Sequence, residues 1–118
     1  MLVDPGAYVS RYAEADKAAT GLGEGAEAWP VPYWWVDGGA AVEVLLLAAV
    51  EAGLGACLFG LFDAEGAVLA AHGVPEGWRA VGTVSLGWPA PDRPGRSQRR
   101  PRPPLDEVVR RGRWGDPG

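Results

Sequence analysis

The stretch AAVEVLLLAAVEAGLGACLFGLF, from Ala40 to Phe62, decides the fold. Its first part, Ala40–Ala52, consists of strong helix formers. Asp37 precedes this part as a candidate N-cap, and Gly53 follows it where a left-handed C-cap is expected. The pattern therefore predicts a helix over Ala40–Ala52.

Apolar residues cover nearly the whole circumference of this predicted helix. Only Glu43 and Glu51 are polar within it. A helix that is apolar all round is normally buried all round, and one small domain could scarcely cover it. We therefore expect a central buried helix that lies against a second subunit.

The segments after this helix alternate between strand and helix signals. A short apolar run bounded by glycine and Asp63 predicts a buried strand over Ala56–Phe62. Asp63 is a candidate cap for a short helix ending at Ala71, and the residues from Trp78 to Trp88 are typical of a strand. Its core candidates are Val81, Val84 and Leu86. This order predicts an α+β fold.

The residues before the central helix are polar and rich in alanine. We interpret 1–29 as a loose helix or loop, with Gly21–Gly25 as a flexible linker. In Trp29–Trp35 two prolines forbid a helix, and four aromatic side chains need a packing partner. This segment is expected to be a buried extended arm or a subunit contact.

Length and composition limit the class of protein. With 118 residues, 47% hydrophobic and 22% charged, we expect one domain, with a core over 30–88. The longest purely apolar run, Val44–Val50, is too short to cross a bilayer, and the N-terminus shows no export signal. We therefore expect a cytoplasmic protein with no membrane partner. Cys57 is the only cysteine, which excludes an internal disulfide and a multi-cysteine metal site.

Charge is distributed unevenly along the chain. Residues 1–78 carry eleven acidic residues against two basic ones, a net charge of −9, whereas 79–118 carry nine arginines against four acidic residues, a net charge of +5. Residues 89–118 form an extended arm rich in proline and arginine. Its arginine cluster suits phosphate or carboxylate oxygens, with a solvated basic arm as the plainer alternative. The cluster comprises Arg93, Arg96, Arg99, Arg100 and Arg102.

The sequence contains no evident acid–base or nucleophilic machinery. His72, the only histidine, falls at the end of the predicted short helix, where a solvent-facing or capping role is the ordinary explanation. Cys57 lies in an apolar strand and is expected to be a small core residue. We therefore predict no catalytic side chain and no metal ligand, and expect a bound cofactor to supply the chemistry.

Taken in order, these segments resemble the second half of the flavin-dependent nitroreductase family. Upstream residues resemble a subgroup of that family, so that the resemblance runs from about Tyr8 to Trp114. The segments that carry it are Tyr12, Asp16-Lys17, Trp29–Trp34, Asp37–Ala41, Val42–Ala52, Gly53–Phe62, Gly73–Pro75, Ser85–Pro89 and Arg100–Val109.

The resemblance implies an α/β sandwich around an antiparallel sheet, of which this chain is a partial version, and a homodimer that binds FMN at its interface. It implies that the backbone around Leu58, Phe59 and Gly60 lines the flavin ring, and that Arg100 and Arg102 hold the FMN phosphate. Family members usually begin with a helix and an arginine–serine–arginine segment, which nothing before Tyr8 matches. We therefore expect this chain, whether a fragment, a mis-started sequence or a reduced homologue, to bind FMN weakly alone.

The leading functional prediction is an FMN-dependent NAD(P)H oxidoreductase that reduces a nitroaromatic, quinone or enone-like acceptor. The alternative is a cofactor-free interaction module that uses the aromatic segment and the Pro/Arg-rich arm to bind a partner protein. Nucleic acid is not expected as a partner, because the basic arm lacks regularly interleaved aromatic residues and the rest of the chain is acidic.

Overall fold

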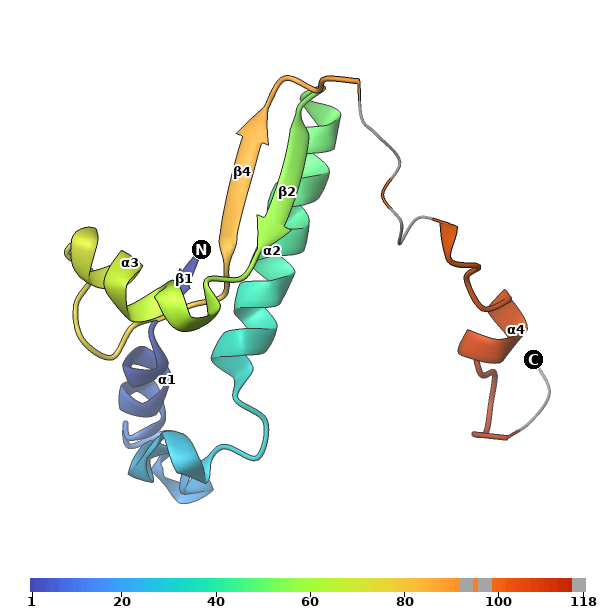
Figure 1. Ribbon diagram of the computed structural model, residues 1–118. Coiled ribbons are helices and arrows are strands. Elements are labelled where there is room, and N and C mark those ends of the chain that lie inside the picture. Colours follow the sequence, from blue (N-terminus) through green and yellow to red (C-terminus); the bar gives the residue numbers. More distant parts are fainter. Residues whose placement is uncertain (92–94, 96–98, 116–118) are drawn as a thin grey trace.

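The computed structural model describes residues 1–91, 95 and 99–115. It contains four α-helices and four short strands in these residues, which confirms the α+β class (Figure 1). The helices and strands are, in order, β1 (Leu2–Val3), α1 (Pro5–Tyr12), α2 (Tyr33–Glu51), β2 (Gly55–Phe59), α3 (Glu65–Ala71), β3 (Arg79–Ala80), β4 (Thr83–Gly87) and α4 (Leu105–Val108). Short 3₁₀ turns are η1 (Ala18–Thr20), η2 (Leu22–Glu24), η3 (Ala26–Ala28) and η4 (Phe62–Ala64).

The central helix α2 begins seven residues earlier than its composition predicts. Pro32 is its N-cap and Tyr33 its first residue, so the aromatic segment is not an extended arm as predicted. A proline is tolerated just before the first turn because no helical hydrogen bond is required of its nitrogen there. Asp37, predicted as the N-cap, lies inside the helix instead.

The end of α2 agrees with the prediction. Gly53 has a φ of 72°, in the left-handed region. Its N–H donates to the carbonyl of Val50 at 3.0 Å, and the N–H of Leu54 donates to the carbonyl of Ala49 at 2.8 Å. These two bonds form a Schellman motif, which satisfies carbonyls that the last turn leaves free.

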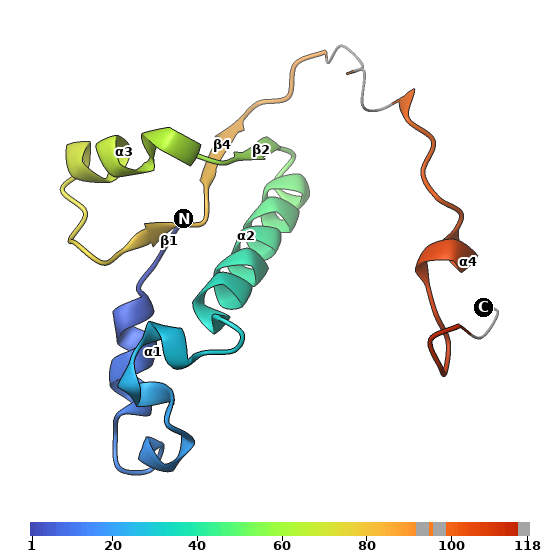
Figure 2. The same ribbon diagram turned by 60° about the horizontal axis from the view of Figure 1, so that its bottom comes forward.

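The strands form two separate antiparallel pairs. β1 pairs with β3, and β2 pairs with β4 in a ribbon that runs from Gly55 opposite Gly87 to Phe59 opposite Thr83. The region predicted as one strand, Trp78–Trp88, is therefore divided between two sheets. Figures 1 and 2 show α2 running alongside the β2–β4 ribbon. The more detailed prediction of a helix–sheet sandwich is not confirmed by this chain alone.

The core lies where α1, β1 and the first turns of α2 meet. Val3, Trp29 and Trp34 are buried there. Trp29 and Trp34 pack edge to face, with ring centroids 5.6 Å apart, and the indole N–H of Trp29 donates to the carbonyl of Leu22 at 2.9 Å. The partly buried residues around them are Tyr8, Tyr12, Leu22, Trp35 and Val81. Trp29 and Trp34 of the aromatic segment thus find their packing partners in the core of their own chain.

The glycine-rich segment before the aromatic residues is packed rather than a simple linker. It forms the 3₁₀ turns η1, η2 and η3, of which η2 and η3 lie against α1 and η1 lies against η2. A β-carbon at Gly23 would come within 2.5 Å of Cα of Ala13. Glycine at this position therefore allows close backbone contact between the turns and the end of α1.

One side of α2 is uncovered within this single chain. That a second subunit covers it stays a prediction. Trp34, Gly38, Val42 and Ala49 are buried, but Val44, Leu47 and Val50 are 66%, 60% and 70% exposed. By length and composition α2 is also long and apolar enough to cross a membrane. Core helices of soluble proteins meet the same criterion. Within the described residues of this single chain, nothing covers that side of α2.

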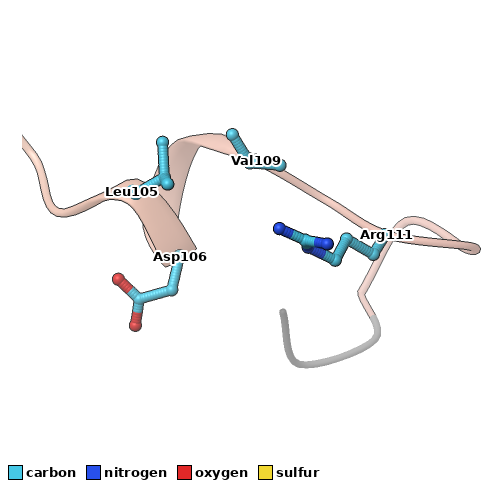
Figure 3. A pocket seen from close by; sticks show the side chains of 4 residues that line it. All are labelled: Leu105, Asp106, Val109 and Arg111. Atoms are coloured by element: carbon cyan, nitrogen blue, oxygen red, sulfur yellow. The ribbon is translucent and has the colours of Figure 1, made fainter.

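The last described segment, 99–115, extends away from the body as an arm (Figure 1). Its only helix within these residues, α4, follows Pro104. A small open hollow of about 250 Å³ lies between α4 and the following residues, lined by Leu105, Asp106, Val109 and Arg111 (Figure 3). Arg93 and Arg96 of the predicted cluster lie outside the described residues.

Candidate functional site

The end of strand β2 is the first candidate region. Leu58 and Phe59 are 43% and 48% exposed, opposite Val84 and Thr83 on β4, and Gly60 follows directly. Successive side chains of a strand point to opposite faces, so Leu58 and Phe59 expose one apolar side chain on each face, and Gly60 adds a backbone without a side chain. The three residues predicted to line a flavin ring thus lie together at one end of the ribbon.

Gly82 brings the start of β4 close to this region. It is buried, and a β-carbon there would come within 2.9 Å of both the carbonyl oxygen of Phe59 and Cδ1 of Leu58. Any larger residue would push the two strands apart at Phe59. Sequence reasoning missed Gly82, although a glycine between two strand-like runs is a recognised signal of close backbone approach.

The turn after β2 contains a strained residue. Phe62 has a φ of 46°, the only positive value of a non-glycine residue in the described chain. Its ring is 87% exposed and lies over Gly60, where a β-carbon would meet Cζ of Phe62 at 3.1 Å. A bulky residue in the left-handed region costs energy and persists only where its surroundings hold it.

An ion pair holds the far end of this turn. Arg79 of β3 donates from Nε to Oε1 of Glu65 at 3.0 Å and from Nη2 to Oε2 at 3.1 Å. The N–H of Ala80 adds a third hydrogen bond to Oε1 at 2.8 Å. The hydrogen bonds from Arg79, and then that from Ala80, lower the pKa of Glu65 below its ordinary value.

The two arginines predicted to hold a phosphate, Arg100 and Arg102, lie on the arm. Both are exposed, and neither makes a hydrogen bond or ion pair within the described residues. Figure 1 shows the arm well apart from the end of β2. A single chain therefore does not bring the arginines together with Leu58, Phe59 and Gly60.

Cys57 and His72 take no evident part in a site. Cys57 is exposed on β2 and is not the core residue that its apolar strand predicted, since β2 is exposed on both faces from Ala56 to Phe59. His72 is an exposed C-cap of α3, as predicted. Between residues 1 and 115, outside the two short undescribed gaps, no group of three potential metal ligands occurs.

The residues present fit the chemistry of a flavin nucleotide in kind. Leu58 and Phe59 expose one apolar side chain on each face of the ribbon, the exposed backbone of Gly60 lies beside the ring of Phe62, and two exposed guanidinium groups suit a phosphate. The fit is divided between two parts of the chain. The hollow on the ribbon, lined by residues from Gly55 to Cys57 and from Ser85 to Trp88, does not include Leu58, Phe59 or Gly60.

Comparison with known proteins decides the family. The model of the nitroreductase family matches residues 7–88, more than half of the chain. The chain belongs to the nitroreductase family. This membership confirms the resemblance, and it supports general oxidoreductase chemistry of the nitroreductase kind, in a family whose members generally use FMN.

One curated relative is itself uncharacterised. It is a 15.4 kDa protein in the ask 5′ region of Mycolicibacterium smegmatis, 38% identical over 101 residues, which cover 80% of this chain and 67% of the relative. No solved structure matches the chain. The roles of individual site residues therefore stay predictions from the family resemblance.

Proposed function

We propose that the protein is an FMN-dependent NAD(P)H oxidoreductase that reduces nitroaromatic, quinone or enone-like acceptors. The observation that carries the proposal is the family match over residues 7–88, which includes the exposed end of β2. When bound, FMN would supply the hydride chemistry between NAD(P)H and the acceptor.

The chain's own residues would bind and orient the cofactor. The backbone around Leu58 and Phe59 would line the ring, and the main chain at Gly60 would offer a hydrogen-bond donor that needs no particular side chain. Arg100 and Arg102 would neutralise the phosphate through charge-assisted hydrogen bonds. No catalytic side chain is required in this scheme.

We further propose that the working form is a homodimer. Two observations support it: the apolar side of α2 that the chain leaves exposed, and the separation of the arginines from the end of β2 within one chain. A second copy would cover the exposed side of α2. It would also be in a position to bring its arginines to the end of β2 in the first copy. The dimer thus links the two parts of the candidate site.

The test is a titration of purified protein with FMN, followed by flavin fluorescence, with NADH and NADPH oxidation measured in the presence of a quinone or a nitroaromatic compound. Because this chain alone is expected to bind FMN weakly, we expect saturable quenching only at high FMN concentration, with slow acceptor-dependent oxidation of at least one nucleotide. A colourless protein that neither quenches FMN fluorescence nor oxidises either nucleotide would contradict the proposal and favour the interaction module.

A further inference from the structure

The turn between β2 and α3 is held at its first end by the strand ribbon. Phe59 is the last residue of β2 and pairs with Thr83. The carbonyl of Phe59 also packs against Gly82, which is buried and has no side chain to separate the strands. The position at which the chain leaves β2 is therefore fixed before Gly60.

The turn itself does not adopt a relaxed conformation. Phe62 is held at a φ of 46°, the N–H of Ala64 donates to the carbonyl of Leu61 at 2.9 Å, and the N–H of Glu65 donates to the carbonyl of Phe62. Two local hydrogen bonds are little compensation for a bulky residue in the left-handed region. The conformation must depend on what holds the two ends of the turn.

Glu65 and Arg79 hold the second end. Glu65 is the first residue of α3, and its side chain is only 21% exposed while it accepts the two bonds from Arg79 and the one from Ala80. The guanidinium of Arg79 also lies 5.4 Å from the ring centroid of Trp35, in the first turn of α2. A two-pronged ion pair that is also stacked on an aromatic ring has a defined geometry, unlike a single exposed contact. The pair therefore joins α3 to β3 and to α2.

We propose that Glu65 and Arg79 are positioning residues, which fix the turn 60–64 and through it present Gly60 and its neighbours to the ring of FMN. The inference rests on the proposed function for its flavin part. Neither side chain needs to touch the cofactor. Their effect passes through the backbone between Glu65 and Phe59, which is short and held at both ends.

The first experiment needs no cofactor. Amide hydrogen exchange is measured on the full chain for the wild type, Arg79→Gln and Arg79→Lys. We expect the amides of 60–64 to exchange roughly tenfold faster in Arg79→Gln, with the β2–β4 amides unchanged. Arg79→Lys should lie between the two, because it keeps the charge but loses the two-pronged geometry.

The chain offers a matched control for this experiment. Arg11 makes an equally two-pronged ion pair with Asp16, at 2.8 Å and 2.8 Å, in a different part of the chain. Arg11→Gln removes the same charge and the same kind of contact but leaves the turn alone. Its exchange rates in 60–64 should match those of the wild type.

The second experiment compares FMN with riboflavin, which lacks the phosphate. Because the turn is proposed to contact the ring, Arg79→Gln should lower the affinity for both ligands by a similar factor, roughly five- to tenfold. Loss of FMN binding alone would instead indicate a phosphate contact and would contradict the inference.

The outcomes separate the inference from the proposed function. A wild-type chain that binds neither flavin would refute the proposed function, and with it the flavin role of the turn. If the wild type binds flavin, unchanged exchange in Arg79→Gln overturns the inference, and so does faster exchange with unchanged affinity for both ligands. Faster exchange together with a parallel loss of both affinities supports it.

Discussion

Gly38 of α2 lies so close to Val81 that a β-carbon at position 38 would come within 2.6 Å of Cγ2 of Val81. The same β-carbon would lie 2.8 Å from Cγ1 of Val3, in the core. Gly38 therefore allows the helix to pack against β1 and the residue after β3. At its neighbour Gly39, a β-carbon would meet nothing within 4 Å.

Alanine at these two neighbouring positions should have opposite effects. Gly38→Ala should destabilise the protein by about 1–3 kcal/mol, because the added methyl forces Val81 and Val3 apart. Gly39→Ala should stabilise it by about 0.5–1 kcal/mol through higher helix propensity. Urea unfolding followed by circular dichroism measures both. Equal effects of the two substitutions would show that the close contact at Gly38 does not exist in solution.

Tyr8 and Asp37 provide a second test of how α1 is attached to α2. The phenol of Tyr8 donates to Oδ2 of Asp37 at 2.7 Å, and this hydrogen bond raises the pKa of Tyr8. Tyr8→Phe should cost about 0.5 kcal/mol, a low value because the bond is exposed to solvent.

The pH dependence of that difference has a defined sign. Because the folded state favours the protonated phenol, the contribution of Tyr8 is present below its ordinary pKa of 10.0 and is lost as pH rises through the raised value. Thermal unfolding of the wild type and Tyr8→Phe at pH 7 and at pH 11 measures it. A stability difference that grows at pH 11 would have the wrong sign.

Local signals in the sequence predicted some elements well. The strand expected over Ala56–Phe62 is found as β2, Gly55–Phe59, and Gly53 ends α2 as expected, but the strand is exposed from Ala56 to Phe59 and not buried as predicted. Both depend on interactions within a few residues: an apolar run between glycines, and a left-handed C-cap. Short-range chemistry of this kind can be inferred from the chain alone.

The start of α2 could not be predicted in the same way. Pro30, Pro32 and the aromatic residues indicate an extended segment, and Asp37 offers a plausible cap. The helix begins at Tyr33 instead, and Trp34 in its first turn is buried against Trp29. Tertiary packing of this kind overrides local propensity, and it is not visible in the sequence.

In the candidate site, too, some residues could be named from the sequence and others depend on tertiary contacts that the sequence does not show. Leu58, Phe59 and Gly60 were identified from the family resemblance, and their roles remain predictions. The pairing of Glu65 with Arg79 was not predicted, because the two residues are fourteen positions apart and meet only once β3 is in place. The strain at Phe62 was also missed, since no residue type signals it.

Acid should affect the Glu65 contact in a defined way. The pKa of Glu65 is lowered in the folded state, so its contribution to stability is present above the ordinary value of 4.5 and is lost as pH falls through the lowered value. We expect the melting temperature of the wild type to fall more steeply than that of Glu65→Gln between pH 6 and pH 3. Parallel curves for the two proteins would refute the contact.

Arg102 should act on the phosphate of FMN. Arg102→Ala should weaken FMN binding by about 1.5–3 kcal/mol and leave riboflavin binding nearly unchanged, because riboflavin has no phosphate. Arg110→Ala is the matched control, since Arg110 also lies on the arm but bonds to the carbonyl of Asp106. Fluorescence titration with both ligands measures the difference, and equal losses for FMN and riboflavin would exclude a phosphate role for Arg102.

The uncovered side of α2 predicts self-association. Leu47 is 60% exposed between Val44 and Val50, which are also exposed. Leu47→Glu should weaken a homodimer roughly 100-fold or more, because each copy would place an unpaired carboxylate in an apolar interface. Ala67→Glu, on the exposed surface of α3, adds the same charge as a control. Sedimentation velocity over a range of concentrations should show dimers for the wild type and Ala67→Glu but monomers for Leu47→Glu. A wild-type chain that remains monomeric throughout would show that α2 does not form the subunit contact.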